Sequence, residues 1–186
     1  MKVSIIGKNT KVAEFLSPVE IVKDSSKADV VIFGDNFSYR SATTQLNKLT
    51  KKQLIVTFNS GMDFFKDKYE YDLCEIRPIY KDQTIPVLCT STHYIYEGLL
   101  NLNYACIPRK NYQRICEIDW SSNIELIGKV TNTSYFTVTG RIPVVSYILS
   151  DKYPTLMLIQ VDVVRFPKFD ISKYINEIIC AFVNSH

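Results

Sequence analysis

The sequence is poor in the residues that build covalent or metal-bound frameworks. Its two histidines form no ligand pair and its five cysteines form no CxxC pair, so no zinc site is indicated. The odd number of cysteines also argues against a disulfide framework, and reduced thiols fit best. No apolar run approaches the roughly 18 residues of a membrane span, and no charged-then-apolar signal segment opens the sequence. We therefore expect a cytoplasmic protein without a membrane partner.

A concentrated charge of one sign is missing as well. The formal net charge is +3, and Lys and Arg are spread along the chain rather than gathered in a basic arm, so nucleic acid is not indicated as a partner. With 186 residues, 46% of them hydrophobic, the chain can bury one core, and we expect a single domain over residues 1–186. Glycine is scarce while Ile, Lys, Asn and Tyr are abundant. This composition fits an AT-rich genome such as that of a phage, and hence a viral protein in a host cytoplasm.

What is present is organised around residues 53–63, QLIVTFNSGMD. Residues 54–58 are apolar and β-prone, and Asn59, Ser60 and Gly61 interrupt them at once, so we predict a strand, a sharp turn and a helix. In an α/β protein such a corner faces the ligand, and enzymes place a nucleophile there. These three residues are also ordinary turn formers, and a plain turn is the alternative.

The first third of the chain predicts a doubly covered, mostly parallel sheet. Apolar runs alternate with segments of helical spacing, and this alternation is typical of parallel strands joined by helices. We expect strands at 2–7, 19–22, 28–33 and 53–58, and helices at 11–16 and at 41–49, the latter capped by Ser41.

The pattern after Phe65 predicts a β-rich insertion. Short strands are expected at 69–80, 85–89, 104–107, 124–130, 135–138 and 144–149. Residues 94–102 fit either a helix or an extended segment. The chain should close with a buried strand at 155–164 and an amphipathic helix at 172–183.

Four separated segments together resemble the class I glutamine amidotransferase family, including its gamma-glutamyl hydrolase relatives. They are DVVIFGDN at 29–36, VTFNSGMD at 56–63, TSTHY at 90–94 and IQVDVV at 159–164. The resemblance implies a flavodoxin-like amidotransferase fold. It places Gly34, Asp35, Ser60 and Gly61 around the oxyanion-type cleft, and Cys89, Ser91, His93 and Gln160 as further polar residues of that cleft.

The positions that the family uses for chemistry are changed here. By the resemblance, the nucleophilic cysteine becomes Asn59, the general-base histidine becomes Asp162, and the carboxylate that orients it becomes Val164. An amide side chain cannot attack a carbonyl carbon, and a valine cannot orient a base by hydrogen bonding. The resemblance therefore implies a catalytically inactive member of the family.

Two other chemistries use residues of the same segments. Cys89 or Ser91 with His93 would form a relocated nucleophile and base, although these partners normally come from different elements. A metal site of Asp35, Asp162 and His93 lacks characteristic ligand spacing, so we expect neither metal nor cofactor.

Tyrosine is concentrated in the middle of the chain. It stands at positions 69, 71, 80, 94, 96, 104 and 112. Such residues pack a β-rich insertion or form an interaction surface. We therefore expect a binding or regulatory protein that contacts a small molecule or a protein through the cleft or the insertion. An enzyme with a nucleophile at Cys89 or Ser91 is the runner-up, and a structural or assembly protein is the third hypothesis.

Overall fold

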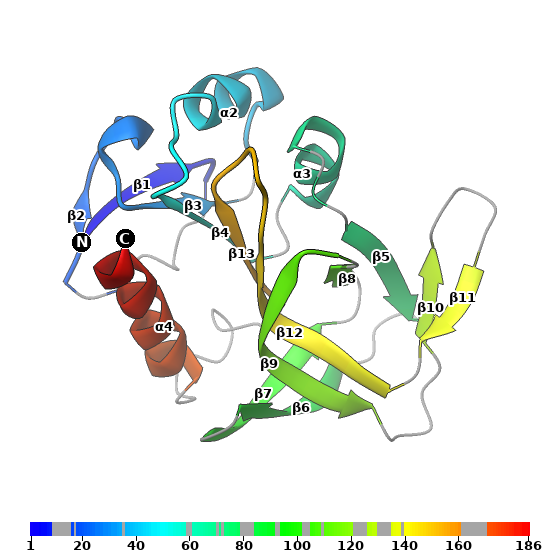
Figure 1. The fold of residues 1–186 in the computed structure, drawn as a ribbon. Helices are drawn as coiled ribbons and strands as arrows, with labels where there is room; N and C mark the ends of the chain where they lie inside the picture. Colours follow the sequence, from blue (N-terminus) through cyan, green and yellow to red (C-terminus); the bar gives the residue numbers. More distant parts are fainter. Residues whose placement is uncertain are drawn as a thin grey trace.

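The computed structural model has an α/β fold built on a large mixed sheet (Figure 1). It describes residues 1–8, 16, 18–34, 36–58, 61–69, 71, 73–78, 84–91, 94–101, 105–108, 110–120, 126–129, 135–138, 140–160 and 171–186. The main sheet has nine described strands in the order β2-β1-β3-β4-β13-β12-β9-β6-β7.

One half of the main sheet is parallel. It contains β2 (Glu20–Ile21), β1 (Lys2–Ile6), β3 (Val30–Phe33), β4 (Leu54–Thr57) and β13 (Thr155–Ile159). Every residue of β3 and β4 is buried, as continuous apolar strands require when both faces are covered. The parallel arrangement predicted for the first third of the chain is confirmed.

Four strands of the region after Phe65 extend this sheet, and four others form a second sheet. β12 (Gly140–Ile148) pairs antiparallel with β13, and β9 (Tyr112–Trp120), β6 (Thr84–Ser91) and β7 (Tyr94–Asn101) follow, all antiparallel. A second, antiparallel sheet has the order β11-β10-β5-β8. Its strands are β11 (Tyr135–Val138), β10 (Leu126–Lys129), β5 (Leu73–Pro78) and β8 (Ala105–Pro108).

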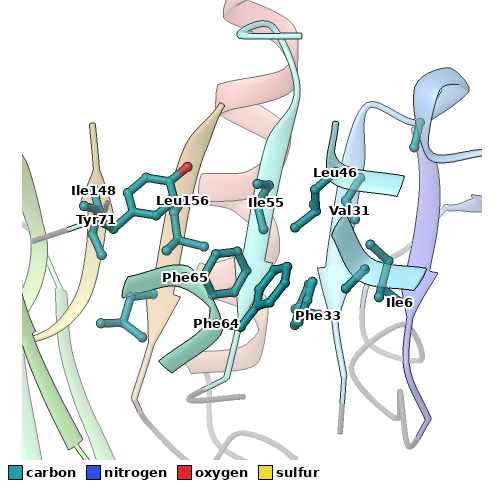
Figure 2. Packing of buried hydrophobic residues seen from close by; sticks show 13 residues of the cluster. Ile6, Val31, Phe33, Leu46, Ile55, Phe64, Phe65, Tyr71, Ile148 and Leu156 are labelled. Carbon is teal, nitrogen blue, oxygen red and sulfur yellow. The ribbon is translucent and has the colours of Figure 1, made fainter. Parts of the chain in front are cut away.

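Helices cover both faces of the parallel half (Figure 1). On one face, α2 (Tyr39–Leu46) and α3 (Met62–Tyr69) pack on the sheet, and on the other lies α4 (Ile171–Ser185). A short 3-10 turn, η1 (Ser25–Lys27), precedes β3. Figure 2 shows Phe64 and Phe65 of α3 resting on Phe33, Ile55 and Leu156 of three neighbouring strands. This cluster is the core on the α2 and α3 face.

Several local predictions were wrong for identifiable reasons. α2 begins at Tyr39 after the N-cap Ser38, so Ser41 lies inside the helix and does not cap it. β9 was not predicted, although residues 116–120, CEIDW, alternate apolar and charged as a strand with one polar face does. β12 begins before Pro143, which lies where the pairing with β9 shifts register, and a bulge tolerates a proline that a regular ladder would not.

Other predictions are settled or fall outside the described residues. Residues 94–101 form a strand, which resolves the alternative left open for that segment, and Tyr69 ends α3 instead of starting a strand. Residues 11–15 and 161–164 lie outside the described residues, so the expected helix at 11–16 and the end of the expected strand at 155–164 stay predictions.

Candidate functional site at the carboxyl ends of the parallel strands

The carboxyl ends of the three central parallel strands lie side by side. Phe33 of β3 pairs with Thr57 of β4, and Thr57 pairs with Leu158 of β13. The segments that begin at 34, 58 and 160 therefore leave the sheet at one edge. These are the segments in which sequence analysis placed the cleft, and their starting points are adjacent in the fold.

Only part of the predicted site lies within the described residues. Gly34, Gly61 and Gln160 are described, with the backbone of Cys89 and Ser91. The other predicted site residues lie outside the described part of the chain: Asp35, Asn59, Ser60, His93, Asp162 and Val164. Asn59 follows the last residue of β4 by two positions. The roles assigned to these residues stay predictions.

Gly34 continues the sheet beyond β3. It is buried, and its backbone N–H donates to the carbonyl oxygen of Ile6 at 2.8 Å. That N–H is therefore engaged in strand pairing in the described structure, rather than directed at a ligand. Asn36, two residues later, has a φ of 53°, a left-handed conformation that Asn tolerates better than most residues.

Gly61 occupies a position that requires glycine. Its φ is +72°, and a Cβ atom built there would lie 2.9 Å from Cε1 of Phe33 and 3.0 Å from Cζ of Phe37. Glycine adopts this backbone conformation without a steric penalty, and it allows the aromatic rings to approach the turn. The residue that sequence analysis singled out for the corner thus has a packing reason to be glycine.

Aromatic rings fill the space beside this turn. Phe33 and Phe37 lie 4.5 Å apart edge to face, and Phe37 stacks on Tyr39 at 5.5 Å. Phe64 lies 5.2 Å from Tyr39 and 5.6 Å from Phe33. Whereas Phe33 and Phe64 are fully buried, Tyr39 is 51% exposed. We call Phe37, Tyr39 and Phe64 the aromatic edge. Its ring pairs have the offset and perpendicular geometries that aromatic side chains favour.

The aromatic edge was not predicted from the sequence. Its residues come from the loop after β3, from α2 and from α3. The signal in the sequence was the concentration of Phe33, Phe37 and Tyr39 directly after a buried strand, together with the Phe64-Phe65 pair. Periodicity assigns residues to helices and strands but does not show which of these elements contact one another, so the contact between these rings could not be predicted.

Buried polar groups lie on the neighbouring strands of the same edge. Thr57 is fully buried and Gln160, one residue beyond β13, is 3% exposed. Ser146 of β12 pairs with Leu158, and its hydroxyl is buried without a hydrogen-bond partner among the described residues. These side chains can donate and accept hydrogen bonds but carry no charge at neutral pH. They can orient a ligand, but they offer neither a nucleophile paired with a base nor a carboxylate.

Cys89 and Ser91 are not brought to this edge. Both lie in β6, which is separated from β4 by β13, β12 and β9. Four strand spacings correspond to roughly 19 Å across the sheet. A nucleophile in β6 would therefore work at a different site from the β4 corner, next to β7, where Tyr96 pairs with Cys89 and Tyr94 with Ser91.

The strand order reverses at the same carboxyl edge of the parallel strands. The chain passes from β1 to β2 on one side and then to β3 on the other, so the order reverses between β1 and β3. In open α/β sheets ligands bind at such a reversal, beyond the carboxyl ends of the strands. Gly7 follows β1 there with a φ of 103°, a conformation open to glycine.

Within the described residues no group of three His, Cys, Asp or Glu side chains is arranged to hold a metal ion. Among the helices described, none combines the length and apolar character needed to cross a membrane. Asp35, Asp162 and His93, the metal set considered above, lie outside those residues.

Comparison with known proteins adds a fold relationship. No model of a protein family and no curated protein matches the sequence. Among solved structures, the N-terminal domain of mmIFT52 is similar, with a TM-score of 0.50 and 10% sequence identity over 100% of this chain and 98% of that one. At this identity the likeness concerns the fold alone. The chain thus shares an α/β fold along its whole length with that domain.

Proposed function

We propose that this chain is a catalytically inactive, amidotransferase-like protein that acts by binding a protein partner. The observation that carries the proposal is the position of β4, which lies between two parallel neighbours and ends two positions before Asn59. In the family that the sequence resembles, this is the position of the nucleophile. The side-chain amide of Asn59 has no nucleophilic chemistry at neutral pH. We therefore assign a binding role to the turn after β4.

The strand order supports the finer fold assignment within this proposal. The parallel half has the order β2-β1-β3-β4-β13, which is the flavodoxin-like order 2-1-3-4-5. The segment after β13 holds Asp162 and Val164 at the family's remaining triad positions. Neither an aspartate without a nucleophile nor a valine supplies the missing steps of amide hydrolysis.

The aromatic edge is the contact surface that we assign to the partner. Tyr39 is 51% exposed while its ring rests on Phe37 and Phe64, so its conformation is fixed before a partner binds. Exposed, pre-ordered tyrosines contribute strongly to protein interfaces because they bury a large area at low entropic cost. The Arg40 side chain beside it is exposed and offers a cation at the rim of that surface.

The first test is for catalysis. Purified protein is incubated with glutamine and with a panel of gamma-glutamyl amides, and the release of ammonia is measured. We expect no release above the buffer background. Turnover that disappears in the Cys89→Ala or Ser91→Ala variant would replace the proposal with the runner-up, an enzyme whose nucleophile lies in β6.

The second test is for the contact surface. Proteins retained by the immobilised wild-type chain are identified and their affinities measured for the Tyr39→Ala variant and for Lys48→Ala, an exposed control just beyond α2. Loss of a central tyrosine costs about 2 kcal/mol, or roughly thirtyfold in Kd, where it anchors an interface. A partner that binds Tyr39→Ala and the control equally well would contradict the assignment of the aromatic edge.

A further inference from the structure

Lysine side chains from two separated segments gather at the amino ends of β3 and β4. η1 carries Lys27 and leads into β3, and the segment between α2 and β4 carries Lys48, Lys51 and Lys52. The first residues of these two strands pair with each other, so the two segments enter the sheet side by side. All four side chains are exposed, and we call them the lysine cluster.

Buried hydrogen bonds hold the two segments together. The Gln53 amide, which is 6% exposed, donates to the carbonyl oxygens of Ser25 and Ala28 at 2.8 and 2.6 Å. It also accepts from the backbone N–H of Thr50 at 2.8 Å. The Ser25 hydroxyl donates to the carbonyl oxygen of Gln45 at 3.0 Å, which ties η1 to α2. The backbone that carries the lysines is therefore fixed before a ligand binds, which lowers the entropic cost of binding.

Carboxylates are scarce beside the lysine cluster. Residues 36–62, which include α2 and β4, contain no Asp or Glu. On the η1 side, Asp24 and Asp29 supply two carboxylates, and Asp29 already accepts a hydrogen bond from the backbone of β1 at 2.6 Å. None of the four lysines forms an ion pair with a carboxylate of the described residues. The described surroundings of the cluster therefore carry an excess of positive charge.

The titration of Asp24 indicates that lysines of both segments act on one place. The pKa of its carboxyl lies below the ordinary value, first because Ser26 donates hydrogen bonds to it and further because the charges of Lys48 and Lys27 lie near it. These two lysines come from different segments of the cluster. A carboxylate brought between the segments by a partner would be stabilised by the same charges.

The composition of the surface does not favour nucleic acid as the anionic partner. Sites for single-stranded nucleic acid alternate cations with stacking aromatic rings. The exposed ring of α2, Tyr39, stands at the first residue of that helix, about 12 Å from its last turn. Domains that bind duplexes through a basic patch typically have a pI above about 9, whereas the pI of this sequence is about 8.5.

An anionic membrane surface is disfavoured for a different reason. Stable attachment to a membrane combines basic residues with an apolar anchor. The large exposed hydrophobic residues of the described chain are Ile21, Tyr39 and Leu149, and none of them belongs to η1 or to residues 47–53. Lysine offers hydrated point charges on flexible stems, and such charges suit carboxylates that are distributed along a polypeptide.

We propose that the lysine cluster docks an acidic segment of a partner protein, a run of Asp and Glu side chains on an extended chain. Charge complementarity supplies the attraction and the specificity. This inference goes beyond the function proposed above. The aromatic edge lies at the amino end of α2 and the lysine cluster begins beyond its carboxyl end, so each surface can fail without the other.

The test uses two dye-labelled peptides of about ten residues, one alternating Glu with Gly and the other alternating Gln with Gly. Binding to the full chain is measured by fluorescence anisotropy at about 50 mM salt, where charge interactions are only partly screened. The Glu peptide should bind saturably and lose about tenfold in affinity at about 200 mM salt. The Gln peptide should show no saturable binding.

A triple variant locates the binding. Replacement of Lys48, Lys51 and Lys52 by Gln should weaken binding of the Glu peptide by about tenfold, because each exposed charge pair contributes about a factor of two in affinity. Circular dichroism verifies that the variant is folded.

The matched control removes the same charge from other elements. Replacement of Lys8, Lys66 and Lys110 by Gln alters three exposed positions away from the cluster, and affinity for the Glu peptide should stay within about twofold of wild type. Tyr39→Ala should also leave this affinity unchanged. A partner of the aromatic edge shows the reverse pattern, lost with Tyr39→Ala and kept with Lys48→Ala, so failure of one proposal is distinguished from failure of the other.

Three results would overturn the proposal. The first is the absence of saturable binding of the Glu peptide at low salt. The second is equal affinity of the two triple variants, because net charge and not the lysine cluster would then govern binding. The third is tighter binding of a single-stranded oligonucleotide of equal charge that the cluster variant loses, because the cluster would then serve nucleic acid.

Discussion

Replacement of Gly61 by alanine tests the geometry of the turn that follows β4. Two costs add at this position. The first is the backbone conformation: a non-glycine residue held at a φ of +72° loses about 1–2 kcal/mol. The second is steric, because the new Cβ would lie 2.9 Å from Cε1 of Phe33 and 3.0 Å from Cζ of Phe37. Carbon atoms prefer separations of about 3.5–4.0 Å.

Relief of that overlap requires the aromatic rings to move. Phe33 is 1% exposed and packs on Phe64 and Phe65, so a shift of its ring disturbs the core on this face. Overpacking of this kind costs about 1–3 kcal/mol. Gly61→Ala should therefore lower the free energy of unfolding by about 2–5 kcal/mol, a large part of the stability of a typical domain.

The assay is equilibrium unfolding in urea followed by circular dichroism, from which the midpoint and the m-value give the free energy of unfolding. Thr44→Ala, at an exposed position of α2, is the control and should change it by less than about 0.5 kcal/mol. In a Phe33→Leu background the cost of Gly61→Ala should fall by about 1 kcal/mol, because part of the overlap is removed. A cost below about 0.5 kcal/mol in the wild-type background would refute both the positive φ and the close ring contact.

Three further predictions concern single polar groups. Tyr71→Phe should lower the free energy of unfolding by about 1–2 kcal/mol in urea titrations, because the buried Tyr71 hydroxyl donates to the Pro154 carbonyl at 2.5 Å; an unchanged midpoint would contradict this bond. Gln53→Met should cost about 2–4 kcal/mol, measured in the same way, because the buried Gln53 amide donates to two backbone carbonyls at 2.6 and 2.8 Å and accepts from one backbone N–H at 2.8 Å; a loss below about 1 kcal/mol would show that these groups find other partners. The pKa of Asp24 lies below its ordinary value, because the carboxylate accepts hydrogen bonds from the Ser26 side chain and backbone N–H. Its contribution to stability is therefore present above the unfolded-state pKa and is lost as the pH falls through the folded-state pKa. Carboxyl carbon chemical shifts followed by NMR should show this lowered titration midpoint, and a midpoint at or above the ordinary value would contradict the hydrogen bonds from Ser26.

The central strands could be predicted because their signal is local. Residues 30–33 and 54–57 are apolar at every position, and a strand buried on both faces needs nothing else from its sequence. The last helix could be predicted for the same reason, since Ile175 and Ile179 recur at helical spacing and are fully buried. The residue types at positions 59, 162 and 164 are given directly by the sequence. The prediction that the family's catalytic chemistry is lost depends on them.

Elements were harder to predict where strand pairing, and not a periodic apolar pattern, determines the structure. In β9 the apolar alternation is broken at Arg114 and Ile115, and pairing with β12 and β6 on its two sides completes the strand. Gln53 was expected as the first residue of a strand, yet its side chain accepts from the backbone N–H of Thr50 and donates to the carbonyls of Ser25 and Ala28. That role depends on residues more than 20 positions away and leaves no local trace.

The sequence by itself determined the apolar strands, the amphipathic final helix and the chemical character of the residues that follow β4. Only the tertiary structure decided that four insertion strands extend the main sheet while four others form a second sheet, that rings from three segments gather beside Gly61, and that Arg114 and Phe182 share a pocket. The physical reason is the range of the interactions. Burial and backbone preference act on neighbouring residues and leave a periodic pattern, whereas strand order and pocket formation depend on which distant surfaces exclude water together.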